Sequence, residues 1–191
     1  MESMKSMSDS AEHQKTQFYD HHVAAGGKMV PFAGYLMPVQ YRAGIMQEHL
    51  HTRNNAGLFD VSHMGQILVK GAGVAVALEK LMPVDLDTLA INQQTYATFT
   101  SPDGGILDDL IVTRWAEDAY FLVVNAACKD QDIEHLKSYL SDFTITHLDQ
   151  YSLIALQGVK AKDIMLELAP ETYDLIFMHG CPVQIDGIEC Y

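Results

Sequence analysis

This sequence has few basic residues and no long hydrophobic run. It carries 12 Lys and Arg against 25 Asp and Glu, which gives a formal net charge of −13. An acidic chain without a basic cluster argues against a nucleic-acid-binding surface. No apolar segment approaches the ~18 residues that a membrane-spanning helix requires, so we expect no membrane partner.

Cysteine is also scarce, and its spacing excludes two classes of site. Cys128, Cys181 and Cys190 form no CxxC pair and no disulfide framework. We therefore expect reduced thiols, no bound metal and a cytoplasmic protein. Residues 1–15 lack the apolar core or Arg-rich character of a targeting peptide. They are interpreted as a disordered lead-in, and residues 16–191 as the folded part.

Apolar residues make up 48% of the chain, which is sufficient for a packed core. Their spacing predicts helices over residues 16–22, 43–56, 72–82, 129–142 and 160–168. Thr16 is the expected N-cap of the first helix, and residues 26–41 are expected to form an apolar loop. Strands are predicted over residues 58–70 (interrupted at residues 62–65), 94–100, 106–114, 119–125, 143–148, 152–157, 183–185 and 188–191. Helices alternate with meandering strands, so the predicted class is α+β, a mainly antiparallel sheet with packed helices.

The densest turn sequence is SPDGG, residues 101–105, and it predicts a hairpin between residues 94–100 and 106–114. The second arm carries two adjacent carboxylates, Asp108 and Asp109, which strand alternation sends to opposite faces. Both faces carry apolar residues, so at least one carboxylate requires compensating hydrogen bonds. Either one aspartate is exposed while the other caps a turn, or one is a perturbed group at a working site.

The hairpin register brings other side chains to Asp109. With the first turn centred between Asp103 and Gly104, Tyr96 lies opposite Ile111, and with the loop after Arg114 centred on Glu117, Asn125 lies opposite Asp109. Tyr96, Asp109 and Asn125 then share one face. They could bind a flat, hydrogen-bonding heterocycle, or they could form a self-satisfied polar patch at a sheet end. A one-residue slip in either turn would separate them.

Four blocks carry a resemblance to a known family. They are FYDHHVAAGGKMVPFAGYLMPVQY (18–41), GLFDVSHMGQILVKG (57–71), GGILDDLIV (104–112) and VVNAAC, which starts at residue 123. In this order and spacing they make residues 16–191 similar to the aminomethyltransferase (T-protein) family of the glycine cleavage system. The resemblance implies a fold in which folate lies in a channel through three domains, the first of ferredoxin-like type.

The resemblance also implies an activity. An aminomethyl group passes from the dihydrolipoyl arm of a lipoylated H-protein to tetrahydrofolate, and ammonia is released. Tetrahydrofolate is the acceptor substrate, and the H-protein supplies the lipoyl group. By this resemblance Asp109 is the catalytic carboxylate beside the pterin, where it stabilises developing positive charge and can relay a proton, and Asp108 is structural. The implied folate contacts are Tyr96, Asn125, Val123, Met64, Leu68 and Ile111.

Two other functions fit the same blocks less well. One is a folate-dependent demethylase of the same superfamily, and the other is a non-catalytic folate-binding protein. The GGILDDLIV and SHMG sequences favour the T-protein, and the cysteine-centred sequence of the non-catalytic type is missing. The family's later domains lie beyond residue 191, so we expect an N-terminal portion that alone binds folate weakly and turns over negligibly.

Overall fold

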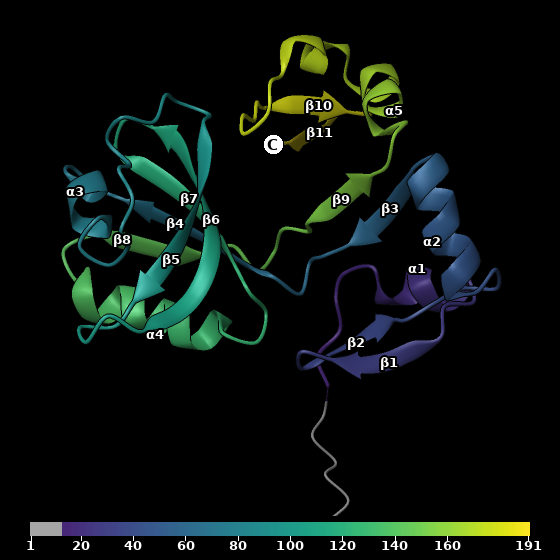
Figure 1. Cartoon of the computed structure of the whole chain (residues 1–191), viewed down its shortest axis with the longest axis horizontal. Helices are drawn as coiled ribbons and strands as arrows, with labels where there is room; N and C mark the ends of the chain where they lie inside the picture. Colours follow the sequence, from purple (N-terminus) through teal and green to yellow (C-terminus); the bar gives the residue numbers. More distant parts are fainter. Residues whose placement is uncertain (1–12) are drawn as a thin grey trace, which may run out of the picture.

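A computed structural model describes residues 13–191, which form two lobes (Figure 1). The first lobe is built on a five-stranded sheet with the strand order β5-β6-β7-β4-β8, and every neighbouring pair is antiparallel. The strands are β4 (Gly65–Lys70), β5 (Gln94–Thr100), β6 (Ile106–Ala116), β7 (Ala119–Val124) and β8 (Thr144–His147). The predicted α+β class with a mainly antiparallel sheet is confirmed.

Two helices complete this lobe: α3 (Val74–Leu78) follows β4, and α4 (Lys129–Tyr139) follows β7. Without β5, the order β6-β7-β4-β8 with these two helices is the βαββαβ arrangement of ferredoxin-like folds. The strand β5 extends that sheet at its edge.

The main core lies between the helices and one face of the sheet. Strand alternation sends Ile67, Val112 and Leu122 to that face, where they are fully buried with Leu78 of α3 and Leu136 of α4. The opposite face carries a smaller cluster, formed by Leu68, Ala119, Phe121 and Leu148. No helix of the main core packs on this second face, which we call the open face.

The second lobe contains the chain on either side of the sheet. Its elements are α1 (Tyr19–Ala24), β1 (Met29–Phe32), β2 (Tyr35–Pro38), α2 (Ile45–Asn54), β3 (Gly57–Asp60), β9 (Ile154–Gln157) and α5 (Ala161–Leu168). Strands β3 and β9 pair antiparallel, which joins segments that the whole first lobe separates in sequence. Within residues 13–191, no helix is long and apolar enough to cross a membrane.

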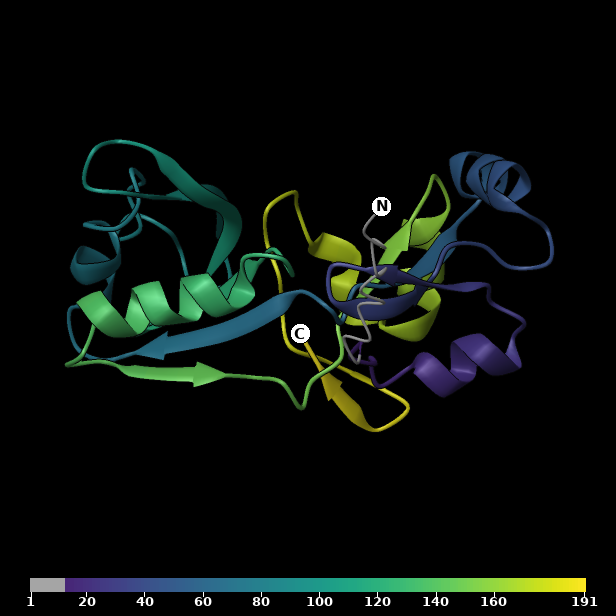
Figure 2. The same ribbon diagram turned by 90° about the horizontal axis from the view of Figure 1, so that it is seen from below.

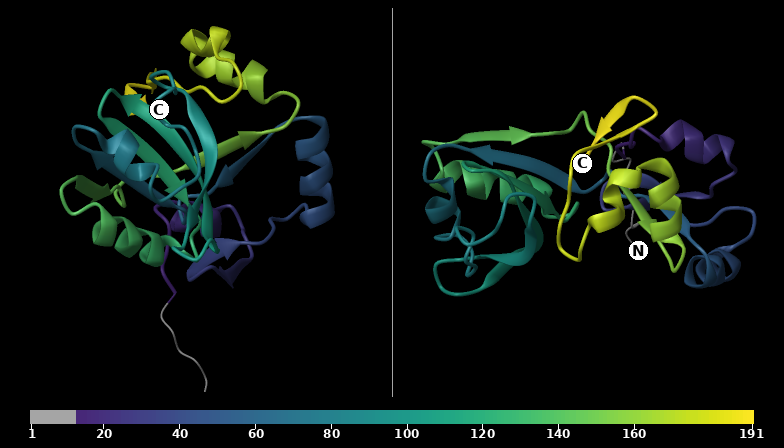
Figure 3. Two further views of the ribbon diagram at one scale, coloured as in Figure 1. Left: turned by 60° about the vertical axis from the view of Figure 1, so that its left-hand side comes forward. Right: turned by 90° about the horizontal axis from the view of Figure 1, so that it is seen from above.

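The C-terminal segment lies between the lobes in Figures 2 and 3, where it is drawn in yellow. It contains the 3₁₀ helix η1 (Pro170–Asp174) and the hairpin of β10 (Val183–Ile185) and β11 (Ile188–Cys190). The segment contacts the five-stranded sheet, because His179 forms a β-bridge with Gln93 and the ring of Tyr191 lies 4.9 Å from that of Trp115.

Three expectations about the N-terminal region need correction. The first helix begins at Tyr19 rather than Thr16, and Phe18, not Thr16, is its N-cap. Residues 26–41 are not a loop throughout, since they contain the β1–β2 hairpin. The expected disordered lead-in, residues 1–15, falls mostly outside the described residues, but Gln14 is ordered and forms a bridge with Tyr35.

Candidate functional site

The open face gathers the side chains that the register argument predicted. Tyr96 pairs with Ile111, as expected. Leu110 pairs with Val124, so the next residues along, Asp109 and Asn125, are neighbours at the end of the ladder. In each hairpin a bulge lies between the turn and these pairs, between Phe99 and Thr100 and between Arg114 and Ala116, and it shifts the register by one residue. The predicted convergence of Tyr96, Asp109 and Asn125 on one face is therefore confirmed.

Asp109 and Asn125 form the polar end of the open face. The side-chain amide of Asn125 donates to the backbone carbonyl of Asp109 at 3.0 Å and to its carboxylate at 3.4 Å. The Asp109 side chain is otherwise exposed, and Tyr96 is 66% exposed. This part of the face therefore presents an accessible carboxylate beside an accessible aromatic ring.

Apolar side chains form the rest of the predicted contact surface. Ile111 and Val123 are half-buried and face each other across β6 and β7, while Leu68 is buried on β4. Ile111 and Val123 therefore add apolar side chains to the face that carries the Asp109 carboxylate, while Leu68 is buried farther along it. Such a combination suits a planar ligand with polar edges, because the ring system buries apolar area while its N–H groups reach the carboxylate.

Asp108 lies on the opposite face, with 7% of its surface exposed. Its carboxylate accepts hydrogen bonds from the backbone N–H of Asn125 at 3.1 Å and from the Asn125 side-chain amide at 3.0 Å. Burial by itself would raise the pKa of Asp108, but the hydrogen bonds from Asn125 hold that pKa below its usual value. Asp108 thus holds both the backbone and the side chain of Asn125 from the core side of the sheet.

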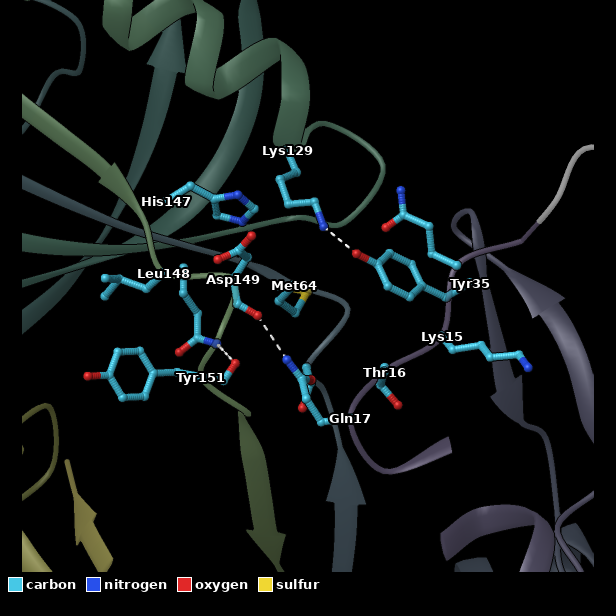
Figure 4. Close-up of a pocket in the computed structure, with 13 residues that line it drawn as sticks. Lys15, Thr16, Gln17, Tyr35, Met64, Lys129, His147, Leu148, Asp149 and Tyr151 are labelled. Atoms are coloured by element: carbon cyan, nitrogen blue, oxygen red, sulfur yellow. Dashed lines mark hydrogen bonds between the residues drawn. The ribbon is translucent and has the colours of Figure 1, made fainter. Parts of the chain in front are cut away.

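Met64 occupies a different position from the other predicted contacts. It precedes β4 and lines a cavity of about 180 Å³ between the lobes (Figure 4). Across this cavity the amine of Lys129 donates to the Tyr35 hydroxyl at 2.6 Å. The side-chain amide of Gln17 donates to the Asp149 carbonyl at 2.8 Å. The cavity is polar, and Met64 is the one predicted contact residue among those that line it.

A second polar cluster, which the sequence analysis does not predict, is centred on Asp60. The Asp60 carboxylate accepts hydrogen bonds from Thr16 at 2.6 Å and from the Ser62 backbone at 2.9 Å, and it lies 2.9 Å from His22. Burial alone would raise the pKa of Asp60, but these bonds lower it. His22 also bonds the Tyr41 hydroxyl at 2.7 Å. The cluster fixes the N-terminal segment onto β3.

A metal site requires several His, Cys, Asp or Glu side chains close together. Among residues 13–191, no group of three or more His, Cys, Asp and Glu side chains is arranged to hold a metal ion. The three cysteines are free thiols and lie apart from one another in sequence.

The family follows from comparison with known proteins. Residues 18–191, which include the open face and the Asp60 cluster apart from Thr16, match the family described as the GCVT N-terminal domain. The chain belongs to this family.

Individual relatives agree with the assignment. The chain is 41% identical over 189 residues to the mitochondrial aminomethyltransferase of Pisum sativum, a match that covers 95% of this chain and 46% of the relative. It is 45% identical over 156 residues to the aminomethyltransferase of Prosthecochloris aestuarii, covering 80% of this chain and 43% of that protein. The chain thus spans about half the length of the curated relatives it matches.

A solved structure supports the fold of this GCVT N-terminal domain. The crystal structure of glycine cleavage system aminomethyltransferase T from Bartonella henselae superimposes with a TM-score of 0.84 at 38% sequence identity. The match covers 90% of this chain and 48% of that one.

Proposed function

We propose that this chain provides the folate-binding face of a glycine cleavage aminomethyltransferase, with tetrahydrofolate as the acceptor and a lipoylated H-protein as the partner. The observation that carries the proposal is the accessible Asp109 carboxylate, held beside Asn125 and Tyr96 on the open face. The names of the relatives support the same activity. The cytoplasmic location expected from the sequence stays a prediction, since several relatives are named mitochondrial.

The proposed reaction exchanges the bonds of one carbon without oxidation or reduction. The methylene carbon of the aminomethyl-lipoyl group loses its bonds to sulfur and to the amine nitrogen. It gains bonds to two nitrogens of tetrahydrofolate, and the products are methylenetetrahydrofolate, ammonia and the dihydrolipoyl carrier. Positive charge develops on the carbon and on the attacking folate nitrogen as ammonia leaves.

Asp109 is the group proposed to act on this charge. A fixed carboxylate next to the pterin stabilises the cationic transition state and can accept a proton from the attacking nitrogen. Tyr96 supplies an aromatic wall for the pterin, and Asn125 a hydrogen-bonding edge. The remaining proposed folate contacts are Ile111, Val123, Leu68 and Met64.

The two proposed ligand contacts Asp109 and Tyr96 are both exposed to solvent. A ligand bound there stays partly hydrated, which weakens each electrostatic interaction with it. We therefore expect the 191-residue chain to bind tetrahydrofolate weakly, and NMR is suited to weak binding. Titration with tetrahydrofolate under reducing conditions should shift amide signals of β5, β6 and β7 around Tyr96, Asp109 and Asn125.

A matched pair of variants makes this titration specific. Asp109→Asn should weaken the apparent affinity at least fivefold, because the amide carries no charge. Asp118→Asn removes the same charge from an exposed turn of the same sheet and should leave the affinity unchanged. Shifts confined to other regions, or equal affinities for the two variants, would refute the proposal.

The transfer itself can be tested in a chimera in which this chain replaces the matching part of the Pisum sativum enzyme. Ammonia release from aminomethylated H-protein is the readout, and circular dichroism verifies folding. Asp109→Ala should lose well over tenfold in rate. Retention of more than about a tenth of the activity would limit the contribution of Asp109 to under ~1.4 kcal/mol and contradict its role.

A further inference from the structure

Asp132 is a buried carboxyl group to which the proposed function assigns no role. It lies in the first turn of α4, is 0% exposed, and neither carboxylate oxygen accepts a hydrogen bond from a donor among residues 13–191. The buried carboxylate of Asp108 is the polar neighbour that acts on its ionisation, and both aspartates lie on the core side of the sheet. Two ionised carboxylates in buried contact repel each other strongly, so one of them must hold a proton.

The hydrogen bonds decide which aspartate holds the proton. Asp108 accepts two N–H groups of Asn125, which stabilise its ionised form. Asp132 has no such donors, so its stable form is the neutral acid, which donates to Asp108. Burial, followed by the hydrogen bond and the negative charge of Asp108, raises the pKa of Asp132 to about 8. Asp132 is therefore a neutral hydrogen-bond donor at neutral pH.

No described cation neutralises the pair. Burial, and after it the charge of Asp108, raises the pKa of the Cys128 thiol, while burial lowers the pKa of His135 one turn along α4. Both groups are therefore neutral near pH 7. The amine of Lys129 is directed to the Tyr35 hydroxyl and the His63 carbonyl instead. Asp109, the remaining charged neighbour, lies on the open face and carries no positive charge.

The pair has a consequence for Asn125. The side-chain amide nitrogen of Asn125 contacts the Asp108 carboxylate at 3.0 Å and the Asp109 carbonyl at 3.0 Å, which occupies both of its N–H groups. The Asn125 carbonyl oxygen is the atom of that side chain left to accept a hydrogen bond from a ligand N–H group. The orientation of Asn125 therefore depends on the position of the Asp108 carboxylate, which repulsion from an ionised Asp132 would displace.

We propose that Asp132 and Asp108 share one proton and act as a positioning pair, which holds Asn125 with its carbonyl oxygen available to the folate. This inference rests on the proposed function for the identity of the ligand, but the shared proton can be tested without it. Neither aspartate touches the open face, so both act through Asn125.

Carbon-13 NMR of the aspartate carboxyl groups in the 191-residue chain is the direct test. One buried carboxyl carbon, assigned to Asp132, should titrate with a midpoint near pH 8, and Asp108 should stay ionised down to below pH 4. The side-chain amide signals of Asn125 should shift with the Asp132 midpoint. If both carboxyl groups titrate below about pH 5, or if the Asn125 signals do not follow Asp132, the pair is refuted.

Variants separate positioning from mere packing. Asp132→Asn keeps a donor toward Asp108, so the Asn125 signals should stay at their low-pH positions and lose their pH dependence. Asp132→Ala removes the donor and should displace these signals at every pH. Asp130→Asn, an exposed carboxylate in the same turn, is the matched control and should behave as the unmodified chain. If Asn and Ala at position 132 give the same result, the positioning role is refuted.

Tetrahydrofolate titrations at pH 7 and pH 9 connect the pair to the ligand. The unmodified chain should bind several-fold more weakly at pH 9, and Asp132→Asn should remove this difference. An equal pH effect in both proteins would refute the link to the ligand. Absence of folate shifts near Asn125 together with an Asp132 midpoint near 8 would refute the proposed function and leave the shared proton standing. An Asp132 midpoint below about 5 would refute the shared proton whatever the folate result.

Discussion

Asn125 donates both its backbone N–H and its side-chain amide to the carboxylate of Asp108, at 3.1 and 3.0 Å. The same side chain reaches Asp109 on the other side of the sheet. The two adjacent aspartates therefore differ in what they do. Asp108 supports the site from the core side, and Asp109 faces the ligand side.

This difference predicts opposite outcomes for two neighbouring substitutions. Asp108→Ala leaves buried donors on Asn125 and Asp132 without an acceptor, so it should destabilise the chain by about 1–3 kcal/mol. Asp109→Ala removes an exposed side chain and should change stability by less than about 0.5 kcal/mol. Urea denaturation followed by circular dichroism measures both. Equal losses of stability would show that Asp109 is also a structural group.

The pKa of Asp132 predicts a pH dependence of stability. Its folded-state pKa of about 8 lies above the unfolded value of about 3.9. Between pH 3.9 and pH 8 the folded state binds one more proton than the unfolded state. The stabilisation of the folded state by this proton is therefore complete below pH 3.9 and is lost as the pH rises through 8. From pH 7 to pH 8 the unmodified chain should lose about 1 kcal/mol relative to Asp132→Asn.

Other groups act in a different pH range. The lowered pKa values of Asp108 and Asp60 contribute stability that is lost only as pH falls below about 4. Burial lowers the pKa values of His63 and His135, so their effect appears as pH falls below about 6.5. Urea denaturation at pH 7, 7.5 and 8 therefore isolates the contribution of Asp132 to the free energy of unfolding. Parallel curves for the chain and Asp132→Asn would contradict the raised pKa.

Much of the open face could be predicted because strand geometry is local. Alternation along β6 separates Asp108 from Asp109, and two short turns fix the pairing of β6 with β5 and β7. These rules need no knowledge of the rest of the chain. They place Tyr96, Asp109 and Asn125 together, but a bulge lies between the turn and these residues in each hairpin and shifts the ladder by one residue, so the observed pairing also depends on the two bulges.

The missed features depend on contacts that are distant in sequence or on an unusual turn. The β1–β2 turn places Ala33 at φ 46° and Gly34 at φ 83°. Alanine rarely adopts a positive φ, so the sequence lacks the usual hairpin turn residues. Thr16 was expected to cap a helix, but it bonds Asp60, which is 44 residues away. The contact of Asp132 with Asp108 likewise depends on how α4 packs on the sheet.

Two aromatic residues on β5 provide a test of the face assignment. Phe99 is 0% exposed in the main core, so Phe99→Ala should cost about 3–5 kcal/mol. Tyr96, three residues earlier, points to the open face, so Tyr96→Ala should cost less than about 0.5 kcal/mol. Tyr96→Ala should instead weaken tetrahydrofolate binding. A large loss of stability for Tyr96→Ala would mean that its ring packs on the protein.

The contact between the lobes predicts an energetic coupling. The amine of Lys129, a residue that is 9% exposed, donates to the Tyr35 hydroxyl at 2.6 Å. Tyr35→Phe removes the acceptor and leaves the buried charge with the His63 carbonyl at 3.4 Å, so it should cost about 1–3 kcal/mol. Lys129→Met removes the charge but keeps an apolar side chain of similar length.

In a double-mutant cycle, Tyr35→Phe should therefore cost much less in the Lys129→Met background, with a coupling energy of about 0.5–3 kcal/mol. Urea denaturation of the four proteins gives this value. Tyr151→Phe is the matched control, since Tyr151 lines the same cavity but its ring is largely exposed. It should show no coupling to Lys129, because no hydrogen bond joins the two side chains in Figure 4. Additive losses for Tyr35 and Lys129 would show that their hydrogen bond does not couple the two lobes.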